Sequence, residues 1–418
     1  MVPFIDTPYR EEAAQIEYEI VTSENIKPLP VYNYHGDDTM FLSMWDKFDA
    51  EYALIKGPDF QLLVPKNDKE KVRNLKDYRS LDELIEHYIE LFGYYNQIAG
   101  FDNSSKENQN GVNRFFFKAD KNGRGGAYYS SEWAANSYST VECWLTEDSW
   151  KVLHEIGHGY QAGFDGVGMY TGEISNNLFG VQYEYNILFG KEADKKGGLF
   201  EGKKDTVERS MYEHMIYEKR TYAEAKANEK LILLAMLKQK AGDEAFAKMY
   251  QEYRKIANQS DFVREDHTLP DLMNRIYSEN SQLDFSGVLE KWGLTLDQVQ
   301  VQKNREHGYP AVASLADVVP ESELARAREL VDPSYLINSN FEMVQNKEIA
   351  ALNLKGDLTI ELSLKDLNLL KGTKITLKDG AKEIATQEIT GGVVTFKNIP
   401  NGIYCAEFSG NQMMYFIP

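Results

Sequence analysis

Cysteine, long apolar runs and positive charge are all scarce in this sequence of 418 residues. Cys143 and Cys405 are the two cysteines and lie far apart in sequence, so we expect two free, buried thiols rather than a disulfide framework. No apolar run approaches the roughly 18 residues of a membrane-spanning helix. The net charge of −19, from 46 Lys and Arg against 65 Asp and Glu, argues against partners such as nucleic acid or an anionic membrane surface.

The start of the sequence, Met1 to Phe4, shows no signal peptide. It has the character of a piece of a longer chain, so we still expect a secreted or cell-surface protein, and the low cysteine content fits a bacterial one. Apolar residues make up 42% of the chain, with 26 Tyr and 20 Phe, so it can bury substantial cores. The length is enough for roughly two to four domains.

The most informative stretch is Val152 to Gln161, which carries the pattern H-E-x-x-H. On a helix, His154 and His158 lie on one face and can bind a single metal ion. Glu155 is rotated by about 100° from His154 around the helix axis, which places its carboxylate where it can take a proton from a metal-bound water. A catalytic Zn²⁺ keeps one position for water, so a third protein ligand is needed.

The flanking residues favour a helix around this motif. Thr146 to Ser149 offers N-cap candidates, Trp150, Leu153 and Ile156 form an apolar stripe, and Gly163 is a plausible stop. Gly157 and Gly159 are poor helix formers, each costing about 1 kcal/mol against Ala. We therefore expect a close approach at these glycines, by a neighbouring strand or by substrate.

The nearest carboxylates after His158 are Asp165, Glu173 and Glu184. Glycines make the segment before Glu173 a loop, which lets the chain turn back, and Glu173 then opens a second helix. Glu184, about three turns further along, is the alternative third ligand. The metzincin pattern fails, because Gln161 and Phe164 stand where its Gly and its third His should be.

The segment His154 to Gln161, followed after a glycine-rich gap by Gly172 to Asn177, resembles the enhancin-like (M60-like) metallopeptidases. The resemblance extends from around Val31 to around Pro310, with its specific motifs between Gly125 and Gly180. It implies that His154, His158 and Glu173 bind zinc and that Glu155 is the catalytic base. Asn176 and Asn177 are placed to hydrogen-bond the groups that hold the metal.

This resemblance implies a gluzincin-like zinc endopeptidase that hydrolyses peptide bonds in glycoproteins, with O-glycosylated, mucin-like proteins as substrates. We expect a monomer that does not bind nucleic acid and does not insert into membranes. One alternative is an inactive or weakly active adhesin, built on the same fold, that binds glycans or proteins; the intact Glu155 argues against it. The other alternative is a purely structural zinc.

Upstream of the motif, Gly126 to Ser131 has the character of an exposed edge strand. In zincins such a strand pairs with extended peptide substrate, so Gly126, Tyr128 and Tyr129 are candidate substrate-binding residues. The alternative is that the two tyrosines simply pack between strand and helix. His214 and His267 are candidate hydrogen-bond donors to the oxyanion, although a position on the surface without a catalytic role fits each of them better. His87 is expected to be a solvated or locally bonded histidine.

The predicted elements indicate an α+β fold with an added helical subdomain and a small C-terminal β-sandwich, and the resemblance implies a zincin-type core, as does fold-level analogy with the order helix, strand, strand, metal helix. We place an N-terminal mixed segment at residues 1–75, the core at 76–200, the helical subdomain at 201–345 and the sandwich at 350–418. We favour a spacer role for the sandwich over carbohydrate binding. The elements that support this division are predicted strands at Gln15–Ile20, Phe60–Pro65 and Arg114–Lys118 (the last one buried), a strand or helix at Ala50–Ile55, a capping box at Ser80–Glu83, a helix at Ala225–Lys240 that is apolar all round, a linker and short charged helix at Pro310–Leu330, and five C-terminal strands with turns at Asp379–Gly380, Gly391–Gly392 and Asn401–Gly402.

Overall fold

The computed structural model describes residues 17, 19, 26–110, 115–131, 133–161, 166–331, 333–363, 370, 372–409 and 414–417. The predicted strand Gln15–Ile20 lies almost entirely outside these residues, and Asp165 and Gly163 lie outside them as well. The chain divides into two compact units. The first comprises Met1–Tyr94 and Gly111–Gly159, and the second comprises Tyr95–Asn110 and Tyr160–Pro418.

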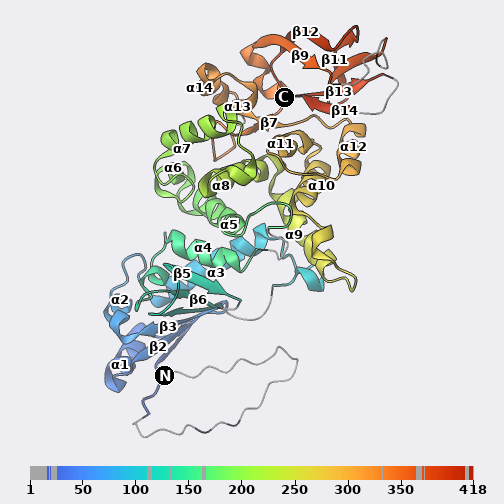
Figure 1. Cartoon of the computed structure of the whole chain (residues 1–418). Coiled ribbons are helices and arrows are strands. Elements are labelled where there is room, and N and C mark those ends of the chain that lie inside the picture. Colours follow the sequence, from blue (N-terminus) through green and yellow to red (C-terminus); the bar gives the residue numbers. More distant parts are fainter. Residues whose placement is uncertain are drawn as a thin grey trace. The chain divides into compact units, whose positions relative to one another are not determined.

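Among the described residues, six strands form the sheet of the first unit, in the order β1-β2-β3-β4-β6-β5 (Figure 1). The strands are β1 (Val31–Asn33), β2 (Tyr52–Lys56), β3 (Phe60–Pro65), β4 (Phe115–Ala119), β5 (Ala127–Ser130) and β6 (Trp133–Asn136). The pairs β2–β3 and β5–β6 are antiparallel, and the other neighbours are parallel. The strand predicted at Phe60–Pro65 is confirmed, and the predicted edge strand is β5.

Strand β4 differs from its prediction as a buried strand. Phe117 is fully buried, whereas Phe115 and Phe116 are only half-buried. Successive side chains of a strand point to opposite faces, so a run of three phenylalanines cannot enter one core. Phe117 stacks on Trp144 with ring centroids 4.4 Å apart and meets Tyr88 at 5.4 Å, which places it in the aromatic core of the unit.

Helix α3 (Leu81–Ile98) carries most of the apolar stripe that faces this core. The predicted capping box is half formed: Ser80 Oγ accepts a hydrogen bond from Glu83 N at 3.1 Å, but the Glu83 carboxylate accepts from Arg79 N. His87 is not solvated, because only 8% of its surface is exposed. Burial lowers the pKa of His87 to about 4, since the charged imidazolium loses its hydration. The remaining helices of this unit are α1 (Asp38–Phe48), α2 (Lys69–Arg73) and α4 (Trp150–His158).

The second unit begins with a mainly helical part. Its helices are α5 (Ser175–Tyr183), α6 (Ala193–Lys196), α7 (Lys204–Met211), α8 (Ala227–Ala241), α9 (Asp243–Ala257), α10 (Leu269–Ser281), α11 (Ser286–Lys291) and α12 (Gln298–Glu306), with π-helical turns η4 (Glu184–Leu188) and η6 (Tyr212–Tyr217). The prediction that the segment around Leu231–Leu237 is buried on all sides is confirmed. Helices α5, α9 and α10 surround α8, which explains why no polar face is needed there.

The short helix predicted in the segment Pro310–Leu330 is confirmed as α14 (Leu324–Arg328). The linker predicted before it is wrong, because that part contains β7 (Ala313–Ser314) and α13 (Leu315–Val318). Strand β7 pairs with β8 (Met343–Val344), and Val312 and Leu315 are fully buried. Such short elements are fixed by distant partners, so local sequence gives little sign of them. Helix α15 (Asn346–Ile349) follows.

The C-terminal strands lie where the alternating pattern predicts them, at β9 (Lys355–Glu361), β10 (Lys374–Asp379), β11 (Lys382–Glu388), β12 (Val393–Pro400), β13 (Tyr404–Phe408) and, in addition, β14 (Met414–Ile417). Within the described residues they form two antiparallel sheets, β11-β10-β13-β14 and β12-β9. Side chains of both sheets, including Leu377 and Phe396, share one apolar core. Gly380 has a φ of 59°, as the predicted turn between β10 and β11 requires.

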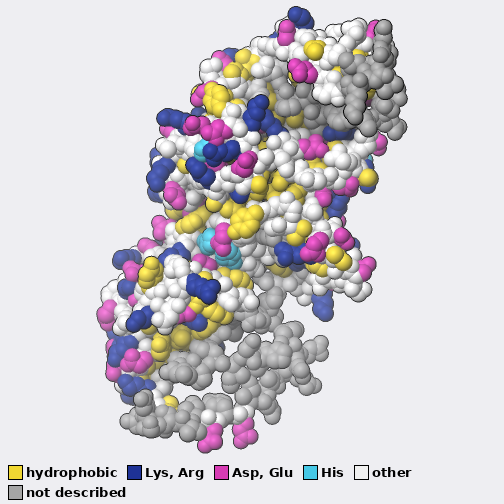
Figure 2. Space-filling model, in the orientation of Figure 1, with side chains coloured by type: hydrophobic (Ala, Val, Ile, Leu, Met, Phe, Trp, Pro, Cys, Tyr) yellow, Lys and Arg dark blue, Asp and Glu magenta, His cyan; other side chains and the backbone are white. Residues whose placement is uncertain are grey.

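Both cysteines are free thiols, as predicted, but Cys143 is only partly buried whereas Cys405 is buried. In the described part of the chain, no helix is both long and apolar enough to cross a bilayer. On the face seen in Figure 2, Lys and Arg side chains are interspersed with Asp and Glu side chains over the described residues.

Candidate metal centre

Helix α4 presents the H-E-x-x-H motif in its last turn and a half. Ser149 occupies the N-cap position, and Val152, Leu153 and Ile156 are buried against the rest of the unit. The helix ends at His158, so the predicted stop at Gly163 is wrong by several residues. The two histidines therefore lie at the C-terminal end of α4, where the chain is about to change direction.

The packing around Gly159 explains why a glycine follows the motif. Its φ of −66° and ψ of −18° are open to any residue, so its role is to leave space. A Cβ atom on Gly159 would lie 2.6 Å from Cζ of Phe115, the first residue of β4. The expected close approach by a neighbouring strand is thus confirmed at this glycine.

The two histidines face each other at a separation that suits a shared metal ion. The Nε2 atoms of His154 and His158 are 3.2 Å apart, and the ring planes are at 89°. Two ligands on a tetrahedral zinc ion, each roughly 2.0–2.1 Å from it, would be roughly 3.3 Å apart. The pair therefore has the spacing of two zinc ligands without any rearrangement of the helix.

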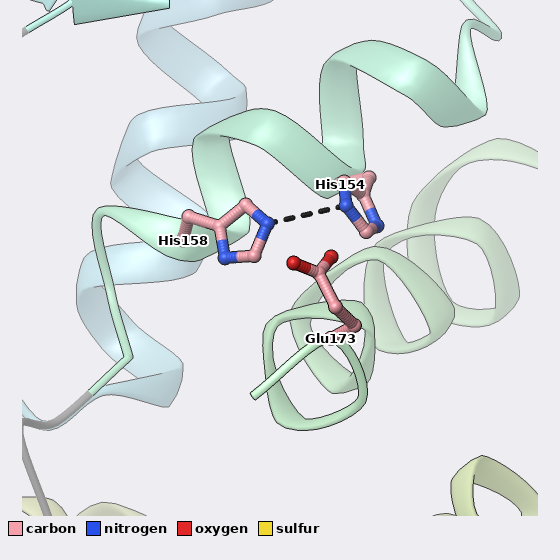
Figure 3. A group of neighbouring side chains, drawn as sticks. All are labelled: His154, His158 and Glu173. Carbon is pink, nitrogen blue, oxygen red and sulfur yellow. Dashed lines mark hydrogen bonds between the residues drawn. The ribbon is translucent and has the colours of Figure 1, made fainter. Parts of the chain in front are cut away.

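Glu173 completes the group. One ligand atom from each of His154, His158 and Glu173 lies within 4.8 Å of the others, and Figure 3 shows the Glu173 carboxylate directed toward the two imidazole rings. Two imidazole nitrogens and one carboxylate oxygen form a donor set that zinc enzymes use with a fourth position left for water. By its chemistry, the set fits the predicted metal.

Gln161 bonds to residues on both sides of Glu173. Its Nε2 donates to the carbonyl oxygen of Gly172 at 2.7 Å and to Ser175 Oγ at 2.8 Å. Asn177 Nδ2 adds a bond to the carbonyl oxygen of Glu173 itself at 2.9 Å. The sequence showed Gln161 only as a departure from the metzincin pattern, because its partners lie 11 and 14 residues away.

Glu184, the alternative third ligand, has a different role. It is fully buried, and its carboxylate accepts a hydrogen bond from the backbone N–H of Gly198 at 2.8 Å. It does not belong to the metal-ligand group found among the described residues. Glu155, one residue after His154, has only 5% of its surface exposed and occupies the helix position that the motif assigns to the base.

Strand β5 runs beside the metal-binding helix. The Tyr129 ring lies over the His158 ring, with centroids 6.2 Å apart and planes at 23°, and Tyr129 OH donates to the carbonyl oxygen of Ser131. Tyr128 OH donates to the Asp120 carboxylate, and burial together with this bond raises the Tyr128 pKa to about 12. Tyr129 thus packs between strand and helix, as the alternative interpretation of the tyrosines expects.

The hydrogen bonds of β6 determine which residues of β5 face outward. Gly126 O accepts from Ser137 N at 3.1 Å, while Asn136 O accepts from Asp120 N at 2.8 Å on the other side of β6. Bonded and non-bonded pairs alternate along an antiparallel ladder, so alternate residues of β5, Ala127 among them, direct their N–H and C=O groups away from β6. The carbonyl of Gly126 points inward.

The two candidate oxyanion donors have other partners. His214 Nδ1 lies 2.7 Å from the buried Glu229 carboxylate. His267 stacks on Phe262 with centroids 5.7 Å apart. The described metal-ligand group does not include either histidine.

Comparisons with known proteins identify first the fold of this chain and then its family. The M60 catalytic domain of ZmpC from Clostridium perfringens, solved in complex with the sialyl T antigen, aligns with a TM-score of 0.55 at 13% identity, covering 94% of this chain and 76% of that one. A functionally unknown conserved protein from Bacillus anthracis aligns with a TM-score of 0.52 at 16% identity, covering 94% and 77%. This chain shares the mixed α and β fold of these structures.

A family model for peptidase M60, enhancin and enhancin-like proteins matches residues 28–275. This match covers more than half of the chain, so the chain belongs to the M60 enhancin-like family, as the residues around the motif indicated. The viral-enhancing factor of Pseudalatia unipuncta granulosis virus is 23% identical over 418 residues, and that of Trichoplusia ni granulosis virus is 22% identical over 418 residues. Each alignment covers 96% of this chain and 46% of the relative, so the chain spans about half the length of these relatives.

Proposed function

We propose that this chain is a zinc-dependent endopeptidase that hydrolyses peptide bonds in glycoproteins, with O-glycosylated, mucin-like proteins as its substrates. The observation that carries the proposal is the convergence of His154, His158 and Glu173, whose ligand atoms lie within 4.8 Å of one another. Membership of the M60 family supports the same activity. On this proposal Glu173, and not Glu184, is the third ligand, and the core around the motif is of the zincin type.

The chemistry then divides between the metal and Glu155. A zinc ion held by the three side chains would supply a Lewis acid and lower the pKa of water toward about 7. Glu155 accepts a proton as the oxygen of water attacks the scissile carbonyl carbon, and it delivers that proton to the amine nitrogen as the carbon–nitrogen bond breaks. The burial of Glu155 keeps its carboxylate in one place for both transfers.

Substrate would bind along the edge of β5. An extended peptide can add to an exposed sheet edge through main-chain hydrogen bonds, and β5 is the last strand of its sheet. Ala127 directs its backbone groups to that edge, and the packing of Tyr129 on His158 places the strand next to the proposed ligands. Gly126 would therefore help to shape the turn into β5, while Ala127 takes over the pairing.

The substrate class and the location rest on relatives. One structural neighbour was solved with the sialyl T antigen, which supports a glycoprotein substrate here. A glycoprotein substrate in turn supports a secreted or cell-surface location. The net charge of −19 would repel heavily sialylated mucins at long range, so we expect cleavage of such mucins to improve with salt.

The test is cleavage of an O-glycosylated mucin beside its enzymatically deglycosylated form and casein, each with and without a zinc chelator. Product termini are read by mass spectrometry. Chelator-sensitive cuts next to glycosylated Ser or Thr, absent from the deglycosylated protein, are the expected result. Cuts in all three substrates would refute the requirement for glycans, and zinc binding without any cut would favour an adhesin.

A further inference from the structure

The proposed ligand Glu173 lies in a turn and not within a regular helix. The turn Gly172–Ile174 precedes α5, which begins at Ser175. The backbone N–H groups of Ile174 and Ser175 donate to Thr171 O, at 2.8 and 2.9 Å. Ile174, the N-cap residue of α5, makes no side-chain cap bond, since its apolar side chain has no acceptor. The position of Glu173 therefore depends on polar side chains that bond to this turn.

Gln161 spans the turn with its side-chain amide. Its Nε2 carries two hydrogens, and it donates to Gly172 O at 2.7 Å and to Ser175 Oγ at 2.8 Å. These two acceptors come immediately before Glu173 and two residues after it. Ser175 has only 3% of its surface exposed, so water has little access to its hydroxyl. One amide therefore links the two ends of the short segment that carries the ligand.

A second amide bonds to the same turn, but from within α5. Asn177 Nδ2 donates to Glu173 O at 2.9 Å, and this bond joins Glu173 to its own helix. Gln161 instead comes three residues after His158, the last residue of α4. It is therefore the side chain that connects the segment leaving the metal-binding helix with the segment that carries the third ligand.

A zinc ion tolerates little error in the position of a ligand. A carboxylate oxygen binds zinc at about 2.0–2.2 Å, and a sound site keeps such distances within about 0.2 Å. Figure 3 shows the Glu173 carboxylate directed toward the imidazoles of His154 and His158, and the ligand atoms lie within 4.8 Å of one another. A shift of the turn would move this carboxylate. Replacing a side chain that orients a ligand typically weakens metal binding by about 10–100-fold.

We propose that Gln161 is a positioning residue of the metal centre: its two bonds to the turn fix Glu173 where the carboxylate can bind zinc. Gln161 acts through Glu173 and takes no part in the proton transfers. The role rests on the proposed function, because it presupposes zinc bound by His154, His158 and Glu173. It also accounts for an amide at this position, since neither an ionised carboxylate nor a thioether of similar length can donate to the Gly172 carbonyl.

The test is a double-mutant cycle on zinc affinity, measured on the full chain by competition with a chelator of known affinity. Gln161→Met keeps the length of the side chain but removes both donors. It should raise the zinc dissociation constant by about 10–100-fold when Glu173 is present. In a Glu173→Ala background it should change the constant by less than about twofold, because the residue through which it acts is gone. General loosening of the fold would weaken zinc binding equally in both backgrounds.

Gln239→Met is the matched control. Gln239 Nε2 donates to Ile337 O at 2.8 Å, so this glutamine also bonds to a distant backbone carbonyl within the second unit. Its replacement should leave the zinc dissociation constant unchanged. In protein loaded with cobalt(II), Gln161→Met should shift the visible spectrum toward that of Glu173→Ala, because a displaced carboxylate alters the geometry at the metal. Gln239→Met should keep the wild-type spectrum.

If Gln161→Met fails to fold, Ser175→Ala takes its place in the same cycle, with a smaller rise in the dissociation constant, because it removes one of the two acceptors. The proposal is overturned if the replacement leaves the zinc dissociation constant unchanged, or if it weakens binding equally with and without Glu173. A wild-type chain that binds no zinc would overturn the proposed function and this role together. Zinc binding that does not depend on Gln161 would overturn the role alone.

Discussion

Replacement of Gly159 by alanine tests how tightly the metal-binding helix is fitted to the sheet. The new Cβ would lie 2.6 Å from Phe115 Cζ and 2.8 Å from Cε1, whereas ordinary carbon contacts are about 3.5–4.0 Å. The Phe115 ring must therefore move by roughly 1 Å. It lies against Phe92 at 4.9 Å and against Tyr129 at 6.2 Å between ring centroids, and these contacts resist the shift.

Two opposing contributions set the size of the effect. Overpacking of this kind costs about 1–3 kcal/mol. Alanine in place of glycine in a helical conformation stabilises the folded state by about 1 kcal/mol. We expect Gly159→Ala to lower the free energy of unfolding by about 0–2 kcal/mol in the wild-type background. In a Phe115→Leu background the clash is gone, so the same substitution should raise it by up to about 1 kcal/mol.

The assay is urea unfolding of the wild type, both single variants and the double variant, analysed as a double-mutant cycle. Zinc affinity is measured on the same proteins, because Tyr129 touches both Phe115 and His158. Gly159→Ala should weaken zinc binding, and Phe115→Leu should restore it in the double variant. A coupling energy near zero, or stabilisation by Gly159→Ala with Phe115 intact, would refute the close fit.

The remaining predictions concern the third ligand, the edge strand and pH. Glu173→Gln should lower zinc occupancy strongly, while Glu184→Gln should destabilise the fold but leave zinc affinity unchanged. Equal decreases in the zinc content of the two variants, measured by elemental analysis, would contradict the choice of Glu173. Ala127→Pro should raise KM at normal zinc content, because proline removes the outward N–H that pairs with substrate, and an unchanged KM would exclude β5 as the binding edge. The pKa of His87 is lowered from 6.5 to about 4 by burial in the folded protein. As pH falls, the imidazole is therefore protonated in the unfolded state at a higher pH than in the folded state. Its stabilising contribution is complete above pH 6.5 and is lost as pH falls toward 4. Between pH 7 and pH 5, the free energy of unfolding measured with urea should fall by about 2 kcal/mol more in the wild type than in His87→Phe. Equal decreases in the two proteins would contradict the burial of His87.

Much of the fold could be predicted because its signals are local. The alternation in the C-terminal strands and the apolar helix around Leu231–Leu237 follow directly from periods of two and 3.6 residues. The short elements β7 and α13 could not be predicted in the same way. The pairing of β7 with β8 joins residues about 30 positions apart, and nothing in a two-residue strand identifies its partner.

In the candidate site too, features set by local sequence could be predicted and features set by distant contacts could not. The face shared by His154 and His158 follows from helix geometry, and the family resemblance pointed to Glu173. The closeness of Gly159 to Phe115 could not be assigned to a particular strand from the sequence, because it depends on a residue more than 40 positions away. The hydrogen bonds of Gln161 to the residues on either side of Glu173 could not be predicted from the sequence. A glutamine has many possible partners, and its bonds to Gly172 and Ser175 depend on the folded chain.

The most direct measurement for the whole account is a comparison of wild type and Glu155→Gln in two assays on the same preparation, zinc content by elemental analysis and hydrolysis of an O-glycosylated mucin. Glutamine preserves the shape of the side chain but cannot take up a proton. The account predicts full zinc occupancy with hydrolysis reduced by about a hundredfold or more. Hydrolysis close to the wild-type rate by the zinc-loaded variant would contradict it.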